Sequence, residues 1–374
     1  RRGFCLYQNT KVTYFPDGAP LLRDLIDRVA RAERFIFLEY FILAEGKLWD
    51  ELEKILCAKA REGVEVKIIF DDFGNIKRFS GETIDRLREV GVEVFIFNPV
   101  HEYVNRLHFN YRDHRKIACI DGDVAYTGGV NIADEYANLI ERFGYWKDSG
   151  VCLEGEGAWG LTASFIRMCV NLGGVMHNEH DYYRPHTPVK SEGFCQPFTD
   201  GPQNNPDNPA EDVFLQMISG ARRFLYITTP YFIPDESLMR ALCIAGDGGV
   251  DVRLMLPGKP DHWYADCVAE SYFGELIKHG VKVYRYIPGF LHGKSIMVDR
   301  EAAFVGSANM DYRSFELDYE CGVMVYSAPM IESLLEDMDM IVDRSHLVTA
   351  EEWAKRSVLR RVFEPLLRLF AIWM

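Results

Sequence analysis

Three features that would assign this chain to a common class are missing from its sequence. Basic residues do not outnumber acidic ones, because 42 lysines and arginines face 56 aspartates and glutamates, for a net charge of −14. A general nucleic-acid-binding protein usually needs a basic surface, so we expect no nucleic-acid partner. No run of about 20 apolar residues occurs, which excludes a bilayer-spanning helix within this sequence. The first residues, RRGFCLYQNT, hold neither Met nor a signal-peptide core, so we expect a longer intact protein.

Cysteine pairs and a nucleotide-binding loop are missing as well. The nine cysteines are scattered and include no C-x-x-C pair. They predict reduced packing residues of a cytosol-facing domain, and neither a disulfide framework nor a zinc site. Gly293-Lys294-Ser295 looks like the end of a P-loop, but Pro288 stands where that motif needs a glycine and offers no N–H to a phosphate. We therefore expect no ATP site.

The sequence does contain a regular alternation of strand and helix patterns. Hydrophobic residues make up 48% of the 374 residues, enough for sizeable cores, and the length predicts about two domains. Apolar, β-branched and aromatic runs at 35–43, 64–70 and 92–97 predict strands, while helical periodicity around 47–62 and 80–90 predicts helices. This order is typical of an α/β architecture.

The second half of the chain repeats the first. Segment 221–236, ARRFLYITTPYFIPDE, matches 32–45, AERFIFLEYFILAE, and the later strand patterns recur in the same order. Arg34 and Arg223 are 189 positions apart, as are Gly91 and Gly280. His114 and His292 are 178 apart, so the first half holds 11 more residues before its histidine. We expect this insertion to form a loop at the mouth of a site.

Composition and the repeat together predict four parts. Residues 1–190 form a first lobe, 191–212 a connector, 213–346 a second lobe and 347–374 a basic amphipathic C-terminal helix. The connector is assigned from DGPQNNPDNPAED, which is dense in Pro, Asn, Asp and Gly.

The predicted C-terminal helix has one polar and one apolar side. At about 100° per residue, Arg360, Arg361, Glu364 and Arg368 fall on one arc. The other side holds Val358, Leu359, Val362, Phe363, Leu366, Leu369, Phe370 and Trp373. A basic amphipathic helix with aromatics suits the headgroup boundary of an anionic membrane. The alternative is a helix packed on the body of the protein or on an oligomer partner, and the oligomeric state stays open.

One motif, H-x-K-x4-D, occurs twice. Its members are His114, Lys116 and Asp121 in the first copy and His292, Lys294 and Asp299 in the second. Both copies continue with six residues and then G-[GS]-x-N, which ends at Asn131 and Asn309. A single H-x-K carries no weight, but the repetition of an eighteen-residue frame is specific.

With these motifs the chain resembles the phospholipase D superfamily. Flanking segments such as TPYFIPD, PGKPDHW and SANMDYRSFEL are similar to those of bacterial cardiolipin synthases, and the resemblance covers about residues 10 to 345. It implies an α/β fold with two similar phospholipase D-like α/β/α lobes that form one active site at their pseudo-twofold interface. It also implies a protein of the bacterial inner membrane, with membrane-spanning helices ahead of residue 1.

Two histidines and two lysines in this pattern fit a two-step transfer at phosphorus. On a strand, His and Lys two residues apart point to the same face, so each motif presents both to one phosphate. One imidazole attacks and forms a phosphohistidine, while the other protonates the leaving alkoxide and later deprotonates the incoming alcohol. The lysines neutralise the phosphate oxygens, so we expect no metal, nucleotide or other cofactor.

Neighbouring residues complete the predicted site. We expect neutral donors to the phosphate oxygens from Asn131, Asn309, Ser307 and the backbone amides of Gly128, Gly129 and Gly306. Asp121 and Asp299 belong to the motif, but their odd spacing from the histidines turns them away from the phosphate. We expect these two aspartates to be buried, hydrogen-bonded and structural.

A nucleophilic histidine needs a carboxylate on its second ring nitrogen. The resemblance implies Glu320 as that partner for His292 and Asp148 as that partner for His114. A symmetric pattern does not say which histidine attacks. The resemblance implies His114 as the nucleophile and His292 as the general acid and base.

The resemblance further implies a phosphatidyltransferase that makes cardiolipin from two phosphatidylglycerol molecules and releases glycerol. Its partners would be phosphatidylglycerol and an anionic membrane surface, with phosphatidylethanolamine open as another donor. The same chemistry fits a phospholipase D-type hydrolase of lipid or, against the acidic charge, of nucleic acid. A non-enzymatic membrane scaffold is the remaining alternative.

Two further groups are weaker candidates. Aromatics near the second motif can line an entrance for acyl chains or pack in the core; these are Tyr284, Tyr286, Phe290 and 262–264. His177, His180 and His186 include an H-x-x-H spacing, but no fourth ligand is evident, so we expect a polar surface loop there and no metal.

Overall fold

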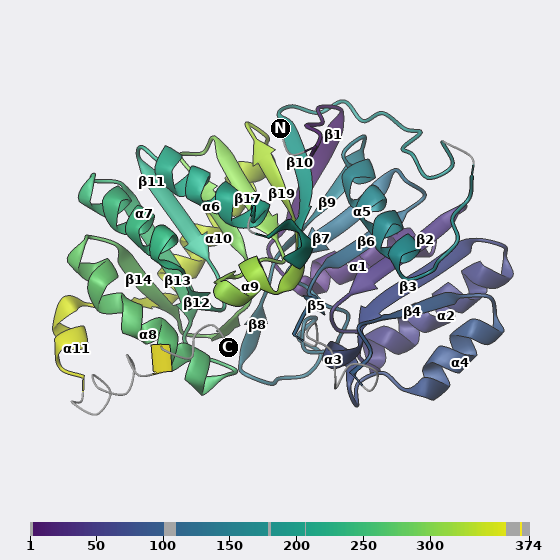
Figure 1. The fold of residues 1–374 in the computed structure, drawn as a ribbon, viewed down its shortest axis with the longest axis horizontal. Coiled ribbons are helices and arrows are strands. Elements are labelled where there is room, and N and C mark those ends of the chain that lie inside the picture. Colours follow the sequence, from purple (N-terminus) through teal and green to yellow (C-terminus); the bar gives the residue numbers. More distant parts are fainter. Residues whose placement is uncertain (1–2, 101–109, 179–180, 206, 357–366, 369–374) are drawn as a thin grey trace.

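The structure is a computed structural model that describes residues 3–100, 110–178, 181–205, 207–356 and 367–368. Two lobes lie side by side, each built on one mixed β-sheet with helices on both faces (Figure 1). The predicted α/β class with two similar lobes is confirmed. Among the described residues, no helix combines the length and the hydropathy needed to cross a membrane.

The first lobe contains a seven-stranded sheet in the order β1-β9-β7-β6-β2-β3-β4. Its strands are β1 (Thr10–Phe15), β2 (Phe35–Tyr40), β3 (Glu65–Asp71), β4 (Glu93–Phe97), β6 (Lys116–Ile120), β7 (Val124–Gly128) and β9 (Gly150–Gly155). Strands β2, β3 and β4 pair in parallel, and the other neighbours pair antiparallel. The strands predicted in this half are confirmed, with ends shifted by up to three residues.

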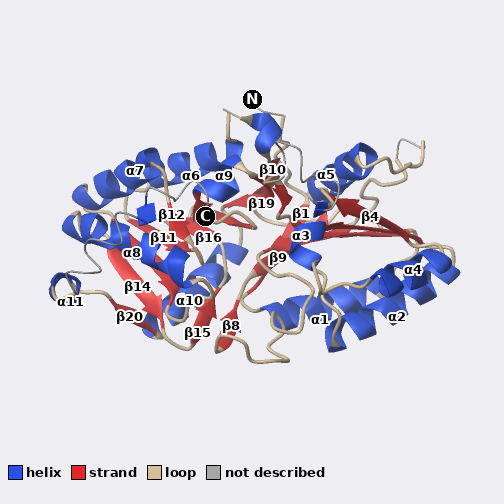
Figure 2. Ribbon diagram, turned by 60° about the horizontal axis from the view of Figure 1, so that its bottom comes forward, coloured by secondary structure: helices blue, strands red, loops and turns tan. Residues whose placement is uncertain are grey.

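Helices cover both faces of this sheet, which explains why its central strands β2 and β3 are buried on both faces. The helices are α1 (Gly18–Val29), α2 (Lys47–Arg61), α3 (Asp72–Asn75), α4 (Gly81–Glu89) and α5 (Ala158–Asn171). Figure 2 shows α1, α2 and α4 on one face and α5 on the other. Alternate residues of β2 follow the two faces, since Ile36 and Leu38 pack with α1 and α2 while Phe35 and Phe37 pack with α5.

The second lobe repeats this plan in the order β10-β19-β17-β16-β11-β13-β14-β20. Its strands are β10 (Phe194–Asp200), β11 (Phe224–Thr228), β13 (Asp251–Pro257), β14 (Lys282–Tyr286), β16 (Ser295–Val298), β17 (Ala302–Gly306), β19 (Asp318–Tyr326) and β20 (Ser345–Leu347). Its helices are α6 (Pro209–Gly220), α7 (Glu236–Asp247), α8 (Trp263–Lys278), α9 (Tyr312–Glu316), α10 (Met330–Asp343) and α11 (Ala350–Ala354). A short pair of strands, β12 (Phe232–Ile233) and β18 (Met310–Asp311), lies beside this sheet.

The lobes are joined by two short parallel strand pairings that exchange segments. Strand β5 (Arg112–Asp113), which precedes the first motif, pairs with β19 of the second lobe. Strand β15 (Gly289–Leu291), which precedes the second motif, pairs with β8 (Tyr145–Lys147) of the first lobe. One hydrophobic core, with α5 and α10 in it, runs through both lobes. Each motif histidine therefore follows a strand that is hydrogen-bonded to the opposite lobe.

The division of the chain into four parts stays a prediction, and the structure adds two details to it. The proposed connector, 191–212, contains β10, an edge strand of the second sheet, and the start of α6. The proline and asparagine that suggested a linker lie at a 3-10 turn, Pro202–Asn204, and at the first turn of α6. The boundary at 346 falls inside β20, which pairs antiparallel with β14.

Most of the predicted C-terminal amphipathic helix lies outside the described residues, as does most of the 11-residue insertion before His114. Within the described part of the tail, Leu367 packs against the core of the second lobe. The guanidinium of Arg368 lies 3.8 Å from the centroid of the Tyr272 ring. These two residues contact the body of the protein.

Candidate active site

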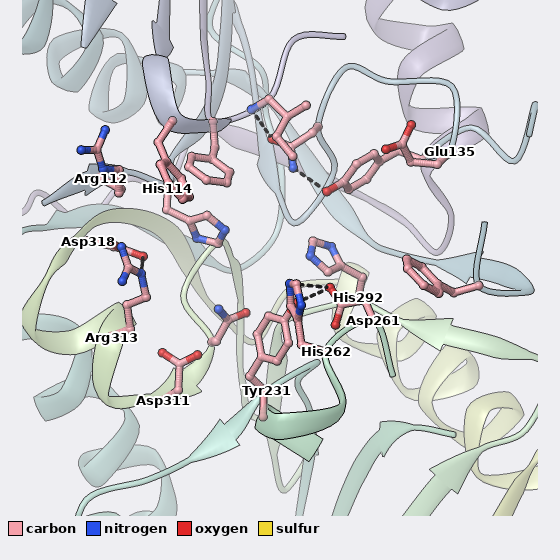
Figure 3. A pocket seen from close by; sticks show the side chains of 18 of the residues that line it. Arg112, His114, Glu135, Tyr231, Asp261, His262, His292, Asp311, Arg313 and Asp318 are labelled. Atoms are coloured by element: carbon pink, nitrogen blue, oxygen red, sulfur yellow. Dashed lines mark hydrogen bonds and ion pairs between the residues drawn. The ribbon is translucent and has the colours of Figure 1, made fainter. Parts of the chain in front are cut away.

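A cavity of about 810 Å³ opens where the two lobes meet, and both motif histidines line it (Figure 3). His114 and His292 face it from different lobes. The other lining side chains include aromatics, namely Phe41, Phe73, Tyr136, Phe143, Trp146, Tyr231, His262 and Tyr264. They also include the charged residues Arg78, Arg112, Arg142, Arg313, Glu135, Asp261, Asp311 and Asp318. The two copies of the motif thus converge on one pocket.

His114 is positioned by the second lobe. Its backbone N–H donates to the carbonyl of Tyr319 at 2.9 Å, which extends the pairing of β5 with β19. Its ring Nδ1 lies 2.9 Å from Glu320 Oε1, and Ser307 Oγ donates to the other oxygen of the same carboxylate. An ionised carboxylate only accepts, so this contact places the proton on Nδ1 and leaves Nε2 with a free lone pair.

His292 is positioned by the first lobe in the same way. Its backbone N–H donates to the carbonyl of Lys147 at 2.6 Å, and its ring Nδ1 lies 2.6 Å from Asp148 Oδ2. The other carboxylate oxygen of Asp148 accepts from the backbone N–H of Ser149 at 2.8 Å. A side chain at Gly129 would overlap that carboxylate, so glycine is required there for the close approach.

The carboxylate pairing implied by the sequence is therefore wrong. Glu320 contacts His114, and Asp148 contacts His292, so each pair joins the two lobes. The cause is the exchange of strands, because β5 lies beside the strand that carries Glu320 and β15 lies beside the strand that ends next to Asp148. Spacing along the chain contains no sign of this exchange.

The motif lysines are buried behind the histidines. Lys116 Nζ donates to the backbone carbonyl of His114, and Lys294 Nζ donates to that of His292 at 2.6 Å. Among the described side chains, neither lysine lines the cavity, so the expectation that each lysine directly faces a phosphate is not met in this structure. Their charges still reach the site, because both lysines lower the pKa of both histidines. That shared influence is independent support for one site.

Burial sets the protonation of these groups. Burial lowers the pKa of His114 well below its usual value and that of His292 to about 4, and the nearby lysines act in the same direction. Burial also lowers the pKa of Lys116 to about 8 and of Lys294 to about 7. The pKa of Glu320 is raised to about 7 by burial against the opposing charge of Lys116. Burial thus favours the neutral form of both imidazoles before an anion binds.

The two motif asparagines differ. Asn131 is fully engaged, since Oδ1 accepts from the backbone N–H of Ile42 at 3.0 Å and Nδ2 donates to Tyr136 Oη at 2.7 Å. Asn309 is equally buried, but its Oδ1 has no hydrogen-bond partner among the described residues. Both asparagines line the cavity. Of the two asparagines, Asn309 is thus the one whose side-chain oxygen is available to accept a hydrogen bond from a ligand.

The other predicted phosphate donors serve the carboxylates and the sheets. Ser307 supports Glu320, and Gly129 makes room for Asp148 while its N–H donates to the carbonyl of Ser149. The N–H of Gly306 donates to the carbonyl of Lys294. Gly128 has a φ of 154° and a backbone packed against Gly150. The expectation that these four groups donate to the phosphate is therefore corrected, because strand pairing already uses or covers them.

The motif aspartates are structural, as expected, but they are not buried. Each is half-buried, has a positive φ and caps the turn before the next strand. Asp121 accepts from the backbone N–H groups of residues 33–35, and Asp299 accepts from those of residues 222–224. A short polar side chain in the left-handed region at a strand turn explains the partial exposure.

The aromatics that could line an entrance or pack in the core divide between the cavity wall and the core. His262 and Tyr264 line the cavity, and Trp263 between them is 64% exposed. Tyr286 and Phe290 are buried in the core, and Tyr284 packs partly buried against it. A strand that enters the motif must pack on both lobes, which accounts for the burial of Phe290.

Sequence reasoning missed the aromatic surroundings of His292. Its ring lies 5.4 Å from that of Trp146, 5.5 Å from that of Tyr136 and 5.5 Å from that of Phe290, measured between centroids. Within the described part of the chain, the ring of His114 meets one aromatic, Phe41, at 5.2 Å. The YWKD segment was a usable signal, because its tryptophan precedes Asp148 by two residues.

The histidine segment 177–186 is described only in part, so the expectation that it holds no metal stays a prediction. His177 lies 3.9 Å from Glu65 and stacks near Tyr182, while His180 lies outside the described residues. In the described part of the chain, donor atoms of His114, Asp318 and Glu320 come within 4.8 Å of one another. Arg313 Nε already lies 3.4 Å from Asp318, and Lys116 acts on Glu320. The charges of that group are thus neutralised by cationic side chains.

Comparison with known proteins agrees with the geometry. A family model described as "Cardiolipin synthase, PLD-like domain" matches residues 25–141 and 214–342, one segment in each lobe. An uncharacterized protein of Streptococcus mutans is 38% identical over 99% of this chain and 80% of its own length. Cardiolipin synthase 2 of Bacillus anthracis is 36% identical over 97% of this chain and 70% of its own. A cardiolipin synthase of Clostridium perfringens is also 36% identical, with 97% and 76% covered.

Solved structures share the two-lobed fold. Phosphatidylserine synthase of Haemophilus influenzae superposes with a TM-score of 0.74 at 15% identity, covering 98% of this chain and 94% of that one. Polyphosphate kinase of Porphyromonas gingivalis superposes with a TM-score of 0.60 at 14% identity, covering 96% and 52%. Proteins with such different names on one architecture show that the fold by itself does not define the substrate.

Proposed function

Because the chain belongs to the cardiolipin synthase family of phospholipase D-like proteins, we propose that it is a phosphatidyltransferase that converts two phosphatidylglycerol molecules into cardiolipin and glycerol. The observation that carries the proposal is the pair of imidazoles on one cavity, each oriented by a carboxylate of the opposite lobe. Transfer between two alcohols exchanges one phosphodiester for another, so the reaction consumes no nucleotide.

In the first step the lone pair of His114 Nε2 attacks the phosphorus of phosphatidylglycerol. The bond from phosphorus to the glycerol oxygen breaks, and that oxygen takes a proton from His292 Nε2. The bound phosphodiester places a negative charge beside His292, which raises its pKa and allows it to hold the proton. Glu320 stabilises the positive charge that develops on the His114 ring.

In the second step a glycerol hydroxyl of another phosphatidylglycerol attacks the phosphohistidine. Its proton passes to His292, the phosphorus–nitrogen bond breaks and His114 recovers its lone pair. Lys116 and Lys294 supply positive charge close to both rings, where negative charge gathers on the phosphoryl oxygens. The assignment of His114 as the nucleophile follows the family resemblance.

We further propose that the protein works at the surface of the bacterial cytoplasmic membrane. Phe73 lines the cavity and is 52% exposed, and Trp263, next to the lining residue His262, is 64% exposed. Exposed aromatics beside a pocket suit the headgroup region of a bilayer, from which a lipid must enter. Arg78 and Arg142 in the cavity wall are complementary to an anionic lipid.

The test is incubation of the protein with phosphatidylglycerol labelled in the glycerol headgroup, in detergent micelles without added nucleotide. Release of glycerol together with a four-chain lipid supports the proposal. Phosphatidic acid as the sole lipid product identifies a hydrolase instead. No turnover of phosphatidylglycerol contradicts the proposal. His346→Ala, at a histidine whose side chain is 53% exposed, is the control for histidine replacement.

A further inference from the structure

One carboxylate in the cavity wall has no role in the chemistry described above. Asp261 stands two residues before α8, on the side of the cavity that holds His292 (Figure 3). Tyr231 Oη donates to Asp261 Oδ2 at 2.6 Å, and His262 Nε2 lies 3.6 Å from the same oxygen. The second oxygen, Oδ1, is buried and has no hydrogen-bond partner among the described residues. Asp261 therefore has an oriented, unused acceptor.

Two of the other three carboxylates of the cavity pair with arginine. Glu135 Oε1 lies 3.0 Å from Arg78 and 3.2 Å from Arg142. Asp318 Oδ2 lies 3.4 Å from Arg313, although its Oδ1, like that of Asp261, has no hydrogen-bond partner among the described residues. The side chain of Asp311 accepts the backbone N–H of Ser314 at 2.7 Å, as the N-cap of α9.

Unlike Glu135 and Asp318, Asp261 has no lysine or arginine nitrogen within 4.0 Å in the described part of the chain. An uncompensated carboxylate next to a phosphodiester site is unfavourable in the absence of hydrogen-bond donors from the ligand. Its charge acts on the catalytic centre, because Asp261 raises the pKa of Lys294. The carboxylate thus requires a ligand group that brings N–H or O–H donors and no negative charge of its own.

The direction of the reaction defines which part of the lipid reaches this position. In a displacement by His114, the leaving alcohol departs on the side opposite the nucleophile and takes its proton from His292. The acceptor alcohol enters on that same side in the second step. Asp261 lies on the His292 side, where the glycerol headgroup stands in both steps.

We propose that Asp261, held by Tyr231, is the subsite that binds a free hydroxyl of the leaving and entering glycerol and so selects a polyol as the alcohol. This subsite rests on the proposed function, and Asp261 is the residue that would recognise the headgroup of the lipid. An ammonium headgroup shares the ability to donate to Asp261. The positive charges of Lys294 and of protonated His292 on this side disfavour an ammonium and favour a neutral polyol.

The test measures which soluble alcohol accepts the phosphatidyl group. Unlabelled phosphatidylglycerol is incubated with labelled glycerol, 1-propanol or ethanolamine, and the labelled lipid is quantified for each. 1-Propanol reacts through the same primary hydroxyl and lacks the hydroxyls that Asp261 binds. Asp261→Asn is expected to lower the ratio of glycerol to propanol transfer about tenfold, the effect of losing one charge-assisted hydrogen bond.

Two further variants sharpen the result. Tyr231→Phe removes the group that orients Asp261, and is expected to lower the same ratio about threefold. Asp247→Asn makes the same chemical change at an aspartate of the second lobe whose side chain is 60% exposed and contacts His279. It is expected to leave the ratio unchanged.

An unchanged ratio in Asp261→Asn overturns the subsite while leaving the proposed function intact. A fall in ethanolamine transfer without a fall in glycerol transfer also overturns the polyol assignment. Absence of transfer to every alcohol by the unsubstituted protein contradicts the proposed function itself, and the subsite with it. Equal thermal unfolding midpoints for the variants and the unsubstituted protein show that the ratios compare folded enzymes.

Discussion

The His114 half and the His292 half of the site contain the same motif in different surroundings. The side chain of His292 is 7% exposed and, among the described residues, lies near three aromatic rings, whereas that of His114 is 13% exposed and meets one. Charged residues of the cavity, Arg313 and Asp318, gather on the His114 side (Figure 3). Duplication of the motif thus supplies two equivalent histidines. The residues around each histidine differ, and this difference gives the two histidines different roles in the reaction.

The same contrast extends to the residues behind the histidines. On the first-lobe side, Arg115 is buried and pairs with Asp113 and Glu39. On the second-lobe side, the matching position is Gly293, and Lys147 pairs with Asp337 at 2.7 Å across the lobe boundary. Each buried cation is matched by carboxylates, as burial of charge requires. The two halves therefore use different ion-pair networks to support the same arrangement of histidine and carboxylate.

The largest effect is expected from removal of either histidine. His114→Ala and His292→Ala should each lower phosphatidyl transfer by at least about 10³-fold, because both steps need the nucleophile on one side of the phosphorus and the proton donor or acceptor on the other. Initial rates with labelled phosphatidylglycerol check this. His346→Ala should stay within about twofold of the unsubstituted protein. Retention of substantial transfer after loss of one histidine would show that the two halves do not share one reaction.

Loss of the crossed carboxylates is expected to have the next largest effect. Glu320→Gln and Asp148→Asn should each lower transfer about 10²-fold, since each leaves a histidine without its orienting partner. The crossing itself is visible in ¹⁵N NMR spectra of the histidine rings. Asp148→Asn should move the signals of His292, and Glu320→Gln those of His114. If Asp148→Asn instead moves the signals of His114, and Glu320→Gln those of His292, then each carboxylate contacts the histidine of its own lobe.

The pH dependence separates the lysines of the two halves. The pKa of Lys294 is lowered to about 7 and that of Lys116 to about 8, both by burial. A lowered lysine pKa means that the positive charge is present below that pH and is lost above it. Glu320, whose pKa is raised to about 7, acts in the opposite direction, because it orients His114 when it is ionised. We therefore expect kcat/KM for phosphatidylglycerol to fall with rising pH above about 8, where Glu320 is ionised and both lysines lose their charge. A profile that stays flat to about pH 9 would contradict a role for these charges.

The smallest effects are expected at the motif aspartates, where the two halves are alike. Asp121→Asn and Asp299→Asn each weaken acceptance of three backbone N–H groups, so each should cost about 1–2 kcal/mol of the free energy of unfolding. Chemical denaturation measures this. Transfer rates of the folded variants should remain within about threefold. A collapse of activity with unchanged stability would give the aspartates a direct role in the reaction.

Much of this architecture could be predicted from the sequence, for identifiable reasons. Strands such as β2 are buried on both faces, so their apolar runs stand out, and the repeated H-x-K frame marks β6 and β16 as equivalent. The repeated frame also places Asp121 and Asp299 at equivalent turns after the two motif strands. These features depend on residues that are close in sequence or duplicated.

Contacts between the lobes could not be predicted in the same way. The pairing of β5 with β19 and of β15 with β8 joins segments far apart in sequence and decides which carboxylate meets which histidine. The roles of Ser307 and Gly129 follow from that exchange. The hydroxyl of Ser307 donates to Glu320, and the absence of a side chain at Gly129 leaves room for Asp148. The role proposed for Asp261 could not be predicted from the sequence either. Whether its carboxylate oxygen has a hydrogen-bond partner depends on the folded wall of the cavity, and the PGKPDHW segment does not indicate it.

The most direct test of the account is identification of the covalent intermediate in the intact protein. A single turnover with phosphatidylglycerol is quenched in alkali, where phosphohistidine survives, and the modified peptide is located by mass spectrometry. The account predicts a phosphatidyl group on His114, none on His292, and loss of the adduct in His114→Ala. An adduct on His292 in the unsubstituted protein, or transfer without any histidine adduct, would contradict it.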